Sequence, residues 1–206
     1  MAAMTLIPAN VVGRISREIK DLATRPPEGI RYVEQEDDSL TEIHADIDGP
    51  VGTPYEAGVF RMKLVLGSDY PAAPPRGFFL TKVYHPNIAA NGDICVNTLK
   101  RDWNEGVTLA HVLQVIRCLL IVPFPESSLN DEAGKLFLES YDEYFKRARL
   151  MTSVHAPRRE VPKAHAGLTD KNGDEEQSTD VSAAKRKVAK EQKKQKENKK
   201  KGLKRL

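Results

Sequence analysis

The sequence is poor in cysteine and has no long apolar run. Its 206 residues include two cysteines, Cys95 and Cys118, too few for a disulfide framework. No segment approaches the ~18 consecutive apolar residues that a membrane-spanning helix needs. The start, MAAMTLIPANVVGRI, lacks the basic residues and continuous apolar stretch of a secretory signal. We therefore expect a protein with no membrane partner, located in the reducing cytoplasm and nucleus.

The net charge of +3 hides an uneven distribution of charge. Residues 185–206 contain 12 Lys and Arg against two Glu, a local charge of +10, whereas the residues before them sum to −7. Beyond Thr152 aromatic residues vanish, and the composition cannot bury enough apolar surface to fold alone. We predict one folded domain at 10–153, a flexible linker at 154–184 and a disordered basic tail at 185–206.

The spacing of apolar residues predicts an α+β domain. A helical period begins at Val12, with Asn10 as its expected N-cap and Pro26 as the breaker that follows. The period then changes to two, which predicts half-buried antiparallel strands. The helical period returns from Thr108 to Pro123, and a continuous helical pattern follows from about 130 to 150. The expected strands lie at about 30–33, 43–47, 60–66 and 77–81.

Cys95 lies in a stretch of about 27 residues, between Thr81 and Thr108, where neither period holds. A loop of that length is unusual in a compact domain and suggests a function. The sequence Asn91-Gly92-Asp93 is typical of a turn, so it favours a loop position for the cysteine that follows. Free cysteine is nevertheless among the most buried residue types. A buried filler and a thiol nucleophile therefore both remain as interpretations of Cys95.

Two further interpretations of Cys95 are weaker. A zinc site needs ligands at short paired spacings, and the histidines and cysteines of this chain form no such pairs, so we expect no metal. A thiol hydrolase needs a histidine that activates the cysteine, and His85 or His111 could be near in space. Neither stretch carries a protease signature.

Three motifs, in order, resemble those of the ubiquitin-conjugating enzymes. The segments GPVGTPYEAGVF and YPAAPP resemble two connections of that family, and they precede its active-site signature. That signature is matched here by HPN at 85–87, seven residues, Cys95, seven residues, and Trp103. The match is collinear from about 10 to 151. It implies the ubiquitin-conjugating (UBC) fold: an N-terminal helix, a four-stranded antiparallel meander, an active-site loop and C-terminal helices.

The resemblance also implies a reaction. Cys95 would accept ubiquitin from the ubiquitin-activating enzyme as a thioester and pass it to a lysine amine, since a thiolate is both a good nucleophile and a good leaving group. Within the HPN motif, His85 is a supporting residue. The family gives Asn87 one of two roles, stabilising the charge on the carbonyl oxygen or bracing the loop. No bound cofactor is expected, because ATP is used upstream by the activating enzyme.

The end of the tail, Leu203-Lys204-Arg205-Leu206, resembles one branch of the family, the S-type enzymes. Their basic tail ends in Leu-Arg-Arg-Leu, so the present chain has Lys204 in place of the first arginine. This resemblance implies elongation of lysine-eleven-linked ubiquitin chains with the anaphase-promoting complex, a RING ligase, which these four residues would contact. The flexible linker and tail together, residues 154–206, would act as a tether that holds a weakly docking catalytic domain near a growing ubiquitin chain.

The residues expected to meet the acceptor lysine depart from the usual pattern. Ser127 stands where most members of the family have Asp, and a serine cannot serve as the same electrostatic partner. A lysine with a pKa of about 10.4 needs a neighbouring group that orients it or takes its proton. Asp131, Glu132 and Glu126 are the candidates, although each can equally be an ordinary acid at a helix N-terminus. Asp131 is preferred, because the S-type branch selects its acceptor with a glutamate there.

Other departures concern the ligase and the second cysteine. RING ligases usually grip an aromatic residue and a Ser-Pro-Ala segment at the positions held here by Ala72 and 104–106. Because an aromatic anchor is a typical interface hot spot, ordinary RING docking is expected to be weak. Cys118 is expected to be an inert thiol in the core helix, which packs on the donor ubiquitin in the family's closed state.

Two functions without catalysis are alternatives. One is a UBC-fold binding module that has lost its activity, but such relatives typically lack the cysteine. The other is a nucleic-acid binder with a basic tail, which rests on the tail alone and predicts salt-sensitive binding of DNA or RNA by 185–206. Nucleic acid is therefore not the expected partner.

Overall fold

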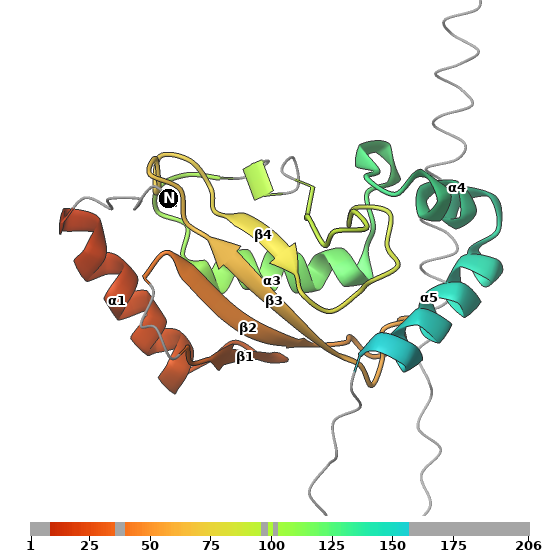
Figure 1. The fold of residues 1–206 in the computed structure, drawn as a ribbon, viewed down its shortest axis with the longest axis horizontal. Coiled ribbons are helices and arrows are strands. Elements are labelled where there is room, and N and C mark those ends of the chain that lie inside the picture. The colour runs from red at the N-terminus through yellow and green to blue at the C-terminus, as the bar shows by residue number, and fades with distance from the viewer. Residues whose placement is uncertain (1–8, 36–39, 96–98, 101–102, 157–206) are drawn as a thin grey trace, which may run out of the picture.

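The computed structural model describes residues 9–35, 40–95, 99–100 and 103–156 (Figure 1). The tail, its four terminal residues and the linker beyond 156 lie outside this range. The predicted α+β class is confirmed. In chain order the elements are α1 (Ala9–Thr24), β1 (Ile30–Val33), β2 (Glu42–Asp48), β3 (Val59–Val65), β4 (Arg76–Phe79), α3 (Leu109–Ile121), the 3-10 turn η1 (Pro125–Ser127), α4 (Asp131–Glu139) and α5 (Tyr141–His155).

The four strands form an antiparallel meander in the order β1-β2-β3-β4, as predicted. In the register of β2 and β3, Ala45 lies opposite Met62 and Ile47 lies opposite Phe60, and all four are fully buried. Because side chains alternate along a strand, the intervening residues face the other side of the sheet. There the carboxylate of Asp46 accepts a hydrogen bond of 2.5 Å from Arg61. One face is therefore core and the other is polar.

Helix α3 covers the apolar side of the sheet (Figure 1). It begins at its N-cap Thr108, whose hydroxyl accepts from the backbone N–H of His111, and it ends before Pro123, as the sequence predicts. The approach to β4 is close, since a Cβ on Gly77 would lie 3.4 Å from a methyl group of Ile116. Its buried residues are Leu109, Val112, Leu113, Ile116, Leu119 and Leu120.

Two helix predictions are wrong in detail. α1 begins at Ala9, so Asn10 lies inside the first turn and is not the N-cap. The continuous pattern from 130 to 150 is divided between α4 and α5, because Ser140 adopts a non-helical backbone with φ −147 and ψ 85. Its N–H still donates to Leu136, so the end of α4 is satisfied. None of the helices within the described residues is long and apolar enough to cross a membrane.

Candidate active site

The part of the β4–α3 connection from 80 to 95 is fixed by short-range pairing although it lacks a regular period. Its two arms meet in an isolated bridge between Ile88 and Ile94, and the N–H of Ala89 donates to Asp93 at 2.9 Å. Gly92 makes the turn between them with φ 89. A Cβ at Gly92 would lie 2.0 Å from the carbonyl oxygen of Phe79, so only glycine fits there. The predicted turn before Cys95 is therefore present and rigidly placed.

Cys95 follows this turn and is buried, with 6% of its surface exposed. Its backbone N–H donates to the carbonyl of Asn87 at 3.0 Å, which holds the cysteine beside the HPN motif. It does not belong to the contiguous hydrophobic core cluster. The loop position expected from the sequence is confirmed, and the side chain is buried there. Cys95 is therefore shielded from solvent and held by the loop that carries the HPN motif.

His85 is completely buried, and both of its ring nitrogens are in use. Nε2 lies 3.0 Å from the carbonyl oxygen of Leu119, and Nδ1 accepts the N–H of Asn87 at 3.0 Å. Nε2 therefore carries the proton. Burial lowers the pKa of His85 to about 3, and the hydrogen bond to Leu119 opposes this only in part. A neutral ring with both nitrogens occupied cannot serve as a base for Cys95, so the hydrolase interpretation finds no support in His85.

The buried ring makes stability depend on pH. An unfolded histidine has a pKa near 6.5, while that of His85 is lowered to about 3, so between these values only the unfolded chain binds the proton. The free energy of unfolding therefore falls as pH falls. Denaturant titrations should therefore give a free energy of unfolding that is lower by about 2 kcal/mol at pH 5 than at pH 7. An NMR titration in which the ring nitrogens of His85 become protonated near pH 6.5 in the folded protein would contradict this assignment.

Asn87 braces the loop with three side-chain hydrogen bonds. Its Nδ2 donates to the carbonyl of Phe124 at 2.6 Å and to that of Ser127 at 3.0 Å, and its Oδ1 accepts the N–H of Phe124 at 2.8 Å. The side chain is fully buried. Both amide hydrogens are thus engaged, so a role at the carbonyl oxygen of the substrate would require one of these bonds to open. Of the two roles the family allows, this geometry is that of bracing.

The segment before α4 is attached to the HPN motif a second time, through Pro86. Its carbonyl accepts the N–H groups of Leu129 and Asn130 at 2.8 and 3.0 Å. Asn130 is also the N-cap of α4, since its side chain accepts from Ala133. Ser127 is half-buried, and its carbonyl rather than its hydroxyl meets Asn87. The start of α4 is consequently fixed relative to the loop that carries Cys95.

The two acidic residues of this helix start differ in their surroundings. Glu132 Oε1 lies 2.5 Å from Arg147 Nη1 of α5, so its charge is already paired. Asp131 is exposed, and within the described residues no hydrogen bond or ion pair engages its carboxylate. Asp131 therefore presents an available carboxylate at the start of α4, and its role toward the acceptor lysine stays a prediction. Glu126, the third candidate, is exposed on η1.

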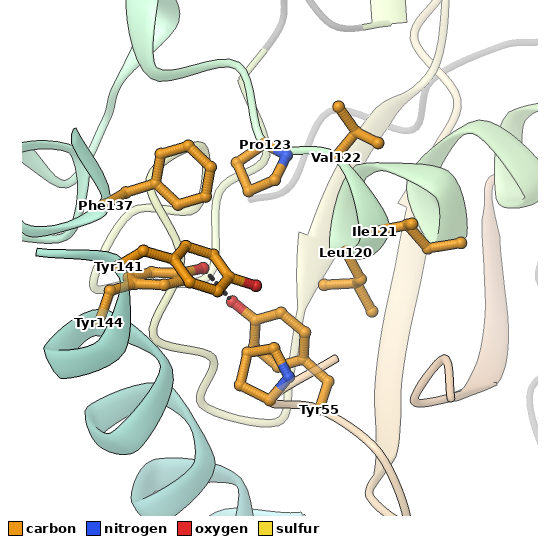
Figure 2. Close-up of a pocket in the computed structure, with 9 residues that line it drawn as sticks. Tyr55, Leu120, Ile121, Val122, Pro123, Phe137, Tyr141 and Tyr144 are labelled. Carbon is orange, nitrogen blue, oxygen red and sulfur yellow. Dashed lines mark hydrogen bonds between the residues drawn. The ribbon is translucent and has the colours of Figure 1, made fainter. Parts of the chain in front are cut away.

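Sequence reasoning missed a pair of buried tyrosines, Tyr55 and Tyr144, that is hydrogen-bonded to the backbone just before the HPN motif. The Tyr55 hydroxyl donates to the carbonyl of Tyr84, next to the HPN motif, and lies 2.7 Å from the hydroxyl of Tyr144 on α5 (Figure 2). Burial raises the pKa of both Tyr55 and Tyr144, so they stay neutral. The apolar hollow beside them has a volume of about 20 Å³, room for one water. Only the position of Tyr55 in the TPY motif hinted at this role.

The ligase-facing segments expected from the family lie at the surface. Trp103 Nε1 donates to the carbonyl of Pro71 at 3.1 Å and so holds the YPAAPP segment at 70–75. Arg14 of α1 donates to the carbonyl of Glu105 and positions the segment after the tryptophan. Ala72 is exposed and offers only a methyl group, so weak RING docking remains a prediction.

Cys118 is exposed on α3, and its expected inertness stays a prediction. It is one of the two free cysteines of the described chain, the other being buried Cys95. No group of three or more His, Cys, Asp and Glu side chains within the described part could hold a metal ion.

Comparison with known proteins agrees with this geometry. A sequence profile described as ubiquitin-conjugating enzyme matches residues 14–152, which include the loop, Cys95 and all the strands. The chain belongs to the ubiquitin-conjugating enzyme family. The enzyme transfers ubiquitin, works with the ubiquitin-activating enzyme and RING ligases, and has the UBC fold.

Similar proteins extend the match beyond the domain. Ubiquitin-conjugating enzyme E2 S of Drosophila virilis is 50% identical over 197 residues, 95% of this enzyme and 93% of that protein. Ubiquitin-conjugating enzyme E2 22 of Arabidopsis thaliana is 57% identical over 76% of this enzyme, a match that spans 62% of the Arabidopsis protein. A crystal structure from Plasmodium yoelii, assigned to the ubiquitin conjugating enzymes, is 32% identical with a TM-score of 0.66 and covers 73% of this enzyme and 98% of that chain.

Proposed function

We propose that the enzyme carries ubiquitin as a thioester on Cys95 and uses it to elongate lysine-eleven-linked ubiquitin chains together with the anaphase-promoting complex. The observation that carries the proposal is the free carboxylate of Asp131 on a helix start that is fixed to the active-site loop. The similarity to E2 S proteins over 95% of the chain supports the S-type assignment.

The chemistry consists of two acyl transfers. The Cys95 thiolate attacks the ubiquitin thioester of the activating enzyme, so one S–C bond forms and one breaks, and the thiolate of the activating enzyme leaves. A lysine amine then attacks the Cys95 thioester; the C–N bond forms, the Cys95 thiolate leaves, and the amine loses its proton to solvent. Asn87 and Pro86 hold the 124–130 segment against the loop during both steps. Asp131 attracts and orients the lysine ammonium, a role for which Ser127 has no charge.

The tail supplies the ligase contact in this proposal. Residues 203–206 place two leucines around Lys204 and Arg205, a pattern suited to a short groove. Because the body of the enzyme has Ala72 where an aromatic anchor is usual, tethering through the tail would compensate for weak docking of the domain.

Linkage analysis tests the proposal. The full-length enzyme, the activating enzyme, ATP and the anaphase-promoting complex should build chains on wild-type ubiquitin, and mass spectrometry should find predominantly lysine-eleven linkages. Ubiquitin with arginine in place of its lysine eleven should lower chain formation at least tenfold, although Cys95 still becomes charged. Undiminished chains on that ubiquitin would refute the linkage assignment and leave the thioester chemistry intact.

A further inference from the structure

A large groove of about 720 Å³ lies beside the active-site loop. Its walls come from the end of β4, the 89–92 turn, the start of α4 and the middle of α5. The 89–92 turn leads directly into Cys95, and the start of α4 carries Asp131. A polypeptide that presents a lysine to Cys95 past Asp131 would therefore lie against this groove. The hollow at Tyr55, by comparison, has room for only one water.

The groove contains charges of both signs. Asp131 and Glu132 form its acidic wall at the N-terminus of α4, while Lys82 and Arg147 also line it. The guanidinium of Arg147 is half-exposed and lies 4.9 Å from the centre of the Tyr84 ring, so it is held in place by stacking as well as by Glu132. A guanidinium has five N–H donors, and the bond to Glu132 uses only part of them.

Tyr84 provides the second observation. It lines the groove and is 93% buried, at 7% exposure, and its hydroxyl has no hydrogen-bond partner among the described residues. Burial raises the pKa of this hydroxyl, while the charge of Arg147 lowers it and that of Glu132 raises it, so both charges lie close to it. A buried hydroxyl without a partner is costly and calls for an explanation. Among the described residues, this donor beside a cation therefore has no acceptor.

We propose that Arg147, Lys82 and the Tyr84 hydroxyl form a subsite for a carboxylate of the acceptor polypeptide, an acidic residue a few positions from the lysine that receives ubiquitin. The carboxylate binds the remaining donors of Arg147, and a small shift of that side chain lets the Tyr84 hydroxyl donate to it. Asp131 takes the lysine ammonium at the other end. The subsite rests on lysine transfer at Cys95 and is independent of chain linkage.

Single-turnover discharge tests the subsite. Enzyme charged with ubiquitin is mixed with peptides that contain one lysine and a single Glu at each position from four before it to four after it, each paired with the same peptide carrying Gln. For at least one position the Glu peptide should react about 2- to 5-fold faster, the range of an exposed ion pair. In the double variant Lys82→Gln/Arg147→Gln this ratio should fall to about 1. Tyr84→Phe should lower it in part, with no loss of unfolding free energy.

Lys146→Gln/Arg149→Gln is the matched control, because both residues are exposed on α5, lose the same two positive charges and do not line the groove. It should keep the wild-type ratio. Charging with ubiquitin and discharge to free lysine are measured for every variant. If a variant loses the preference for Glu peptides while these two rates are unchanged, the effect lies in the subsite and not in the transfer reaction. Equal rates for all Glu and Gln pairs in the wild type, or a preference that survives in the double variant, would overturn the proposal.

Discussion

Replacing Cys95 with alanine should abolish the ubiquitin adduct. With ubiquitin, the activating enzyme and ATP, the wild type should form an adduct that disappears on reduction, because a thioester is cleaved by thiols. Cys95→Ala should form none, a loss of at least ~1,000-fold, since covalent catalysis has no substitute nucleophile at that position. Gel electrophoresis with and without reductant measures both. The variant should remain folded, because the side chain lies outside the hydrophobic core cluster and loses only a small volume.

The second cysteine provides the matched control for this experiment. Cys118→Ser changes the other thiol, which is exposed on α3, and should charge with ubiquitin as the wild type does. Cys95→Ser should differ again: a hydroxyl is a poorer nucleophile, so any adduct should form slowly and resist reductant. An adduct on Cys95→Ala that reductant removes would assign the thioester to another residue and would refute the role proposed for Cys95.

The sequence was sufficient for the elements and the motif because both are local. Alternation along 43–47 and 60–66 reports which strand face is buried, and the spacing of 85–87, Cys95 and Trp103 identifies the loop. The spacing of apolar residues does not reveal a break in a helix when the same spacing continues on both sides of the break. Apolar residues recur at helical spacing on both sides of Ser140, so the break between α4 and α5 leaves no signal there. Asn10 likewise has cap chemistry but not the cap position.

The partners of the site residues could not be predicted, since they come from distant parts of the chain. His85 meets Leu119, 34 residues away, and Asn87 meets Phe124, 37 residues away. Tyr55 and Tyr144, separated by 89 residues, make contact only when α5 packs under the loop. The sequence therefore suggested that Asn87 matters, but only the packed structure distinguishes a brace from a group that acts on the substrate.

Replacing Asn87 with aspartate should destabilise the enzyme strongly. The carboxylate would place an oxygen where Nδ2 now lies, 2.6 and 3.0 Å from the carbonyl oxygens of Phe124 and Ser127. Two hydrogen bonds become repulsions at a fully buried position, so the free energy of unfolding should fall by about 3–5 kcal/mol. Denaturant unfolding at pH 7 measures this. Asn104→Asp is the control, because its exposed Oδ1 accepts from Gly106 and a carboxylate keeps that bond; we expect a change within about 0.5 kcal/mol.

The activity of Asn87→Ala then separates the two roles of the side chain. If Asn87 braces the loop, hydrogen exchange at Leu129 and Asn130 should accelerate, because their bonds to Pro86 depend on the same attachment, and ubiquitin discharge should slow along with it. If Asn87 stabilises the carbonyl oxygen, exchange should stay protected while discharge alone falls by about 100- to 1,000-fold. The three occupied hydrogen bonds favour the first outcome. Intact protection with slow discharge would show that the amide leaves its carbonyl partners when the thioester reacts.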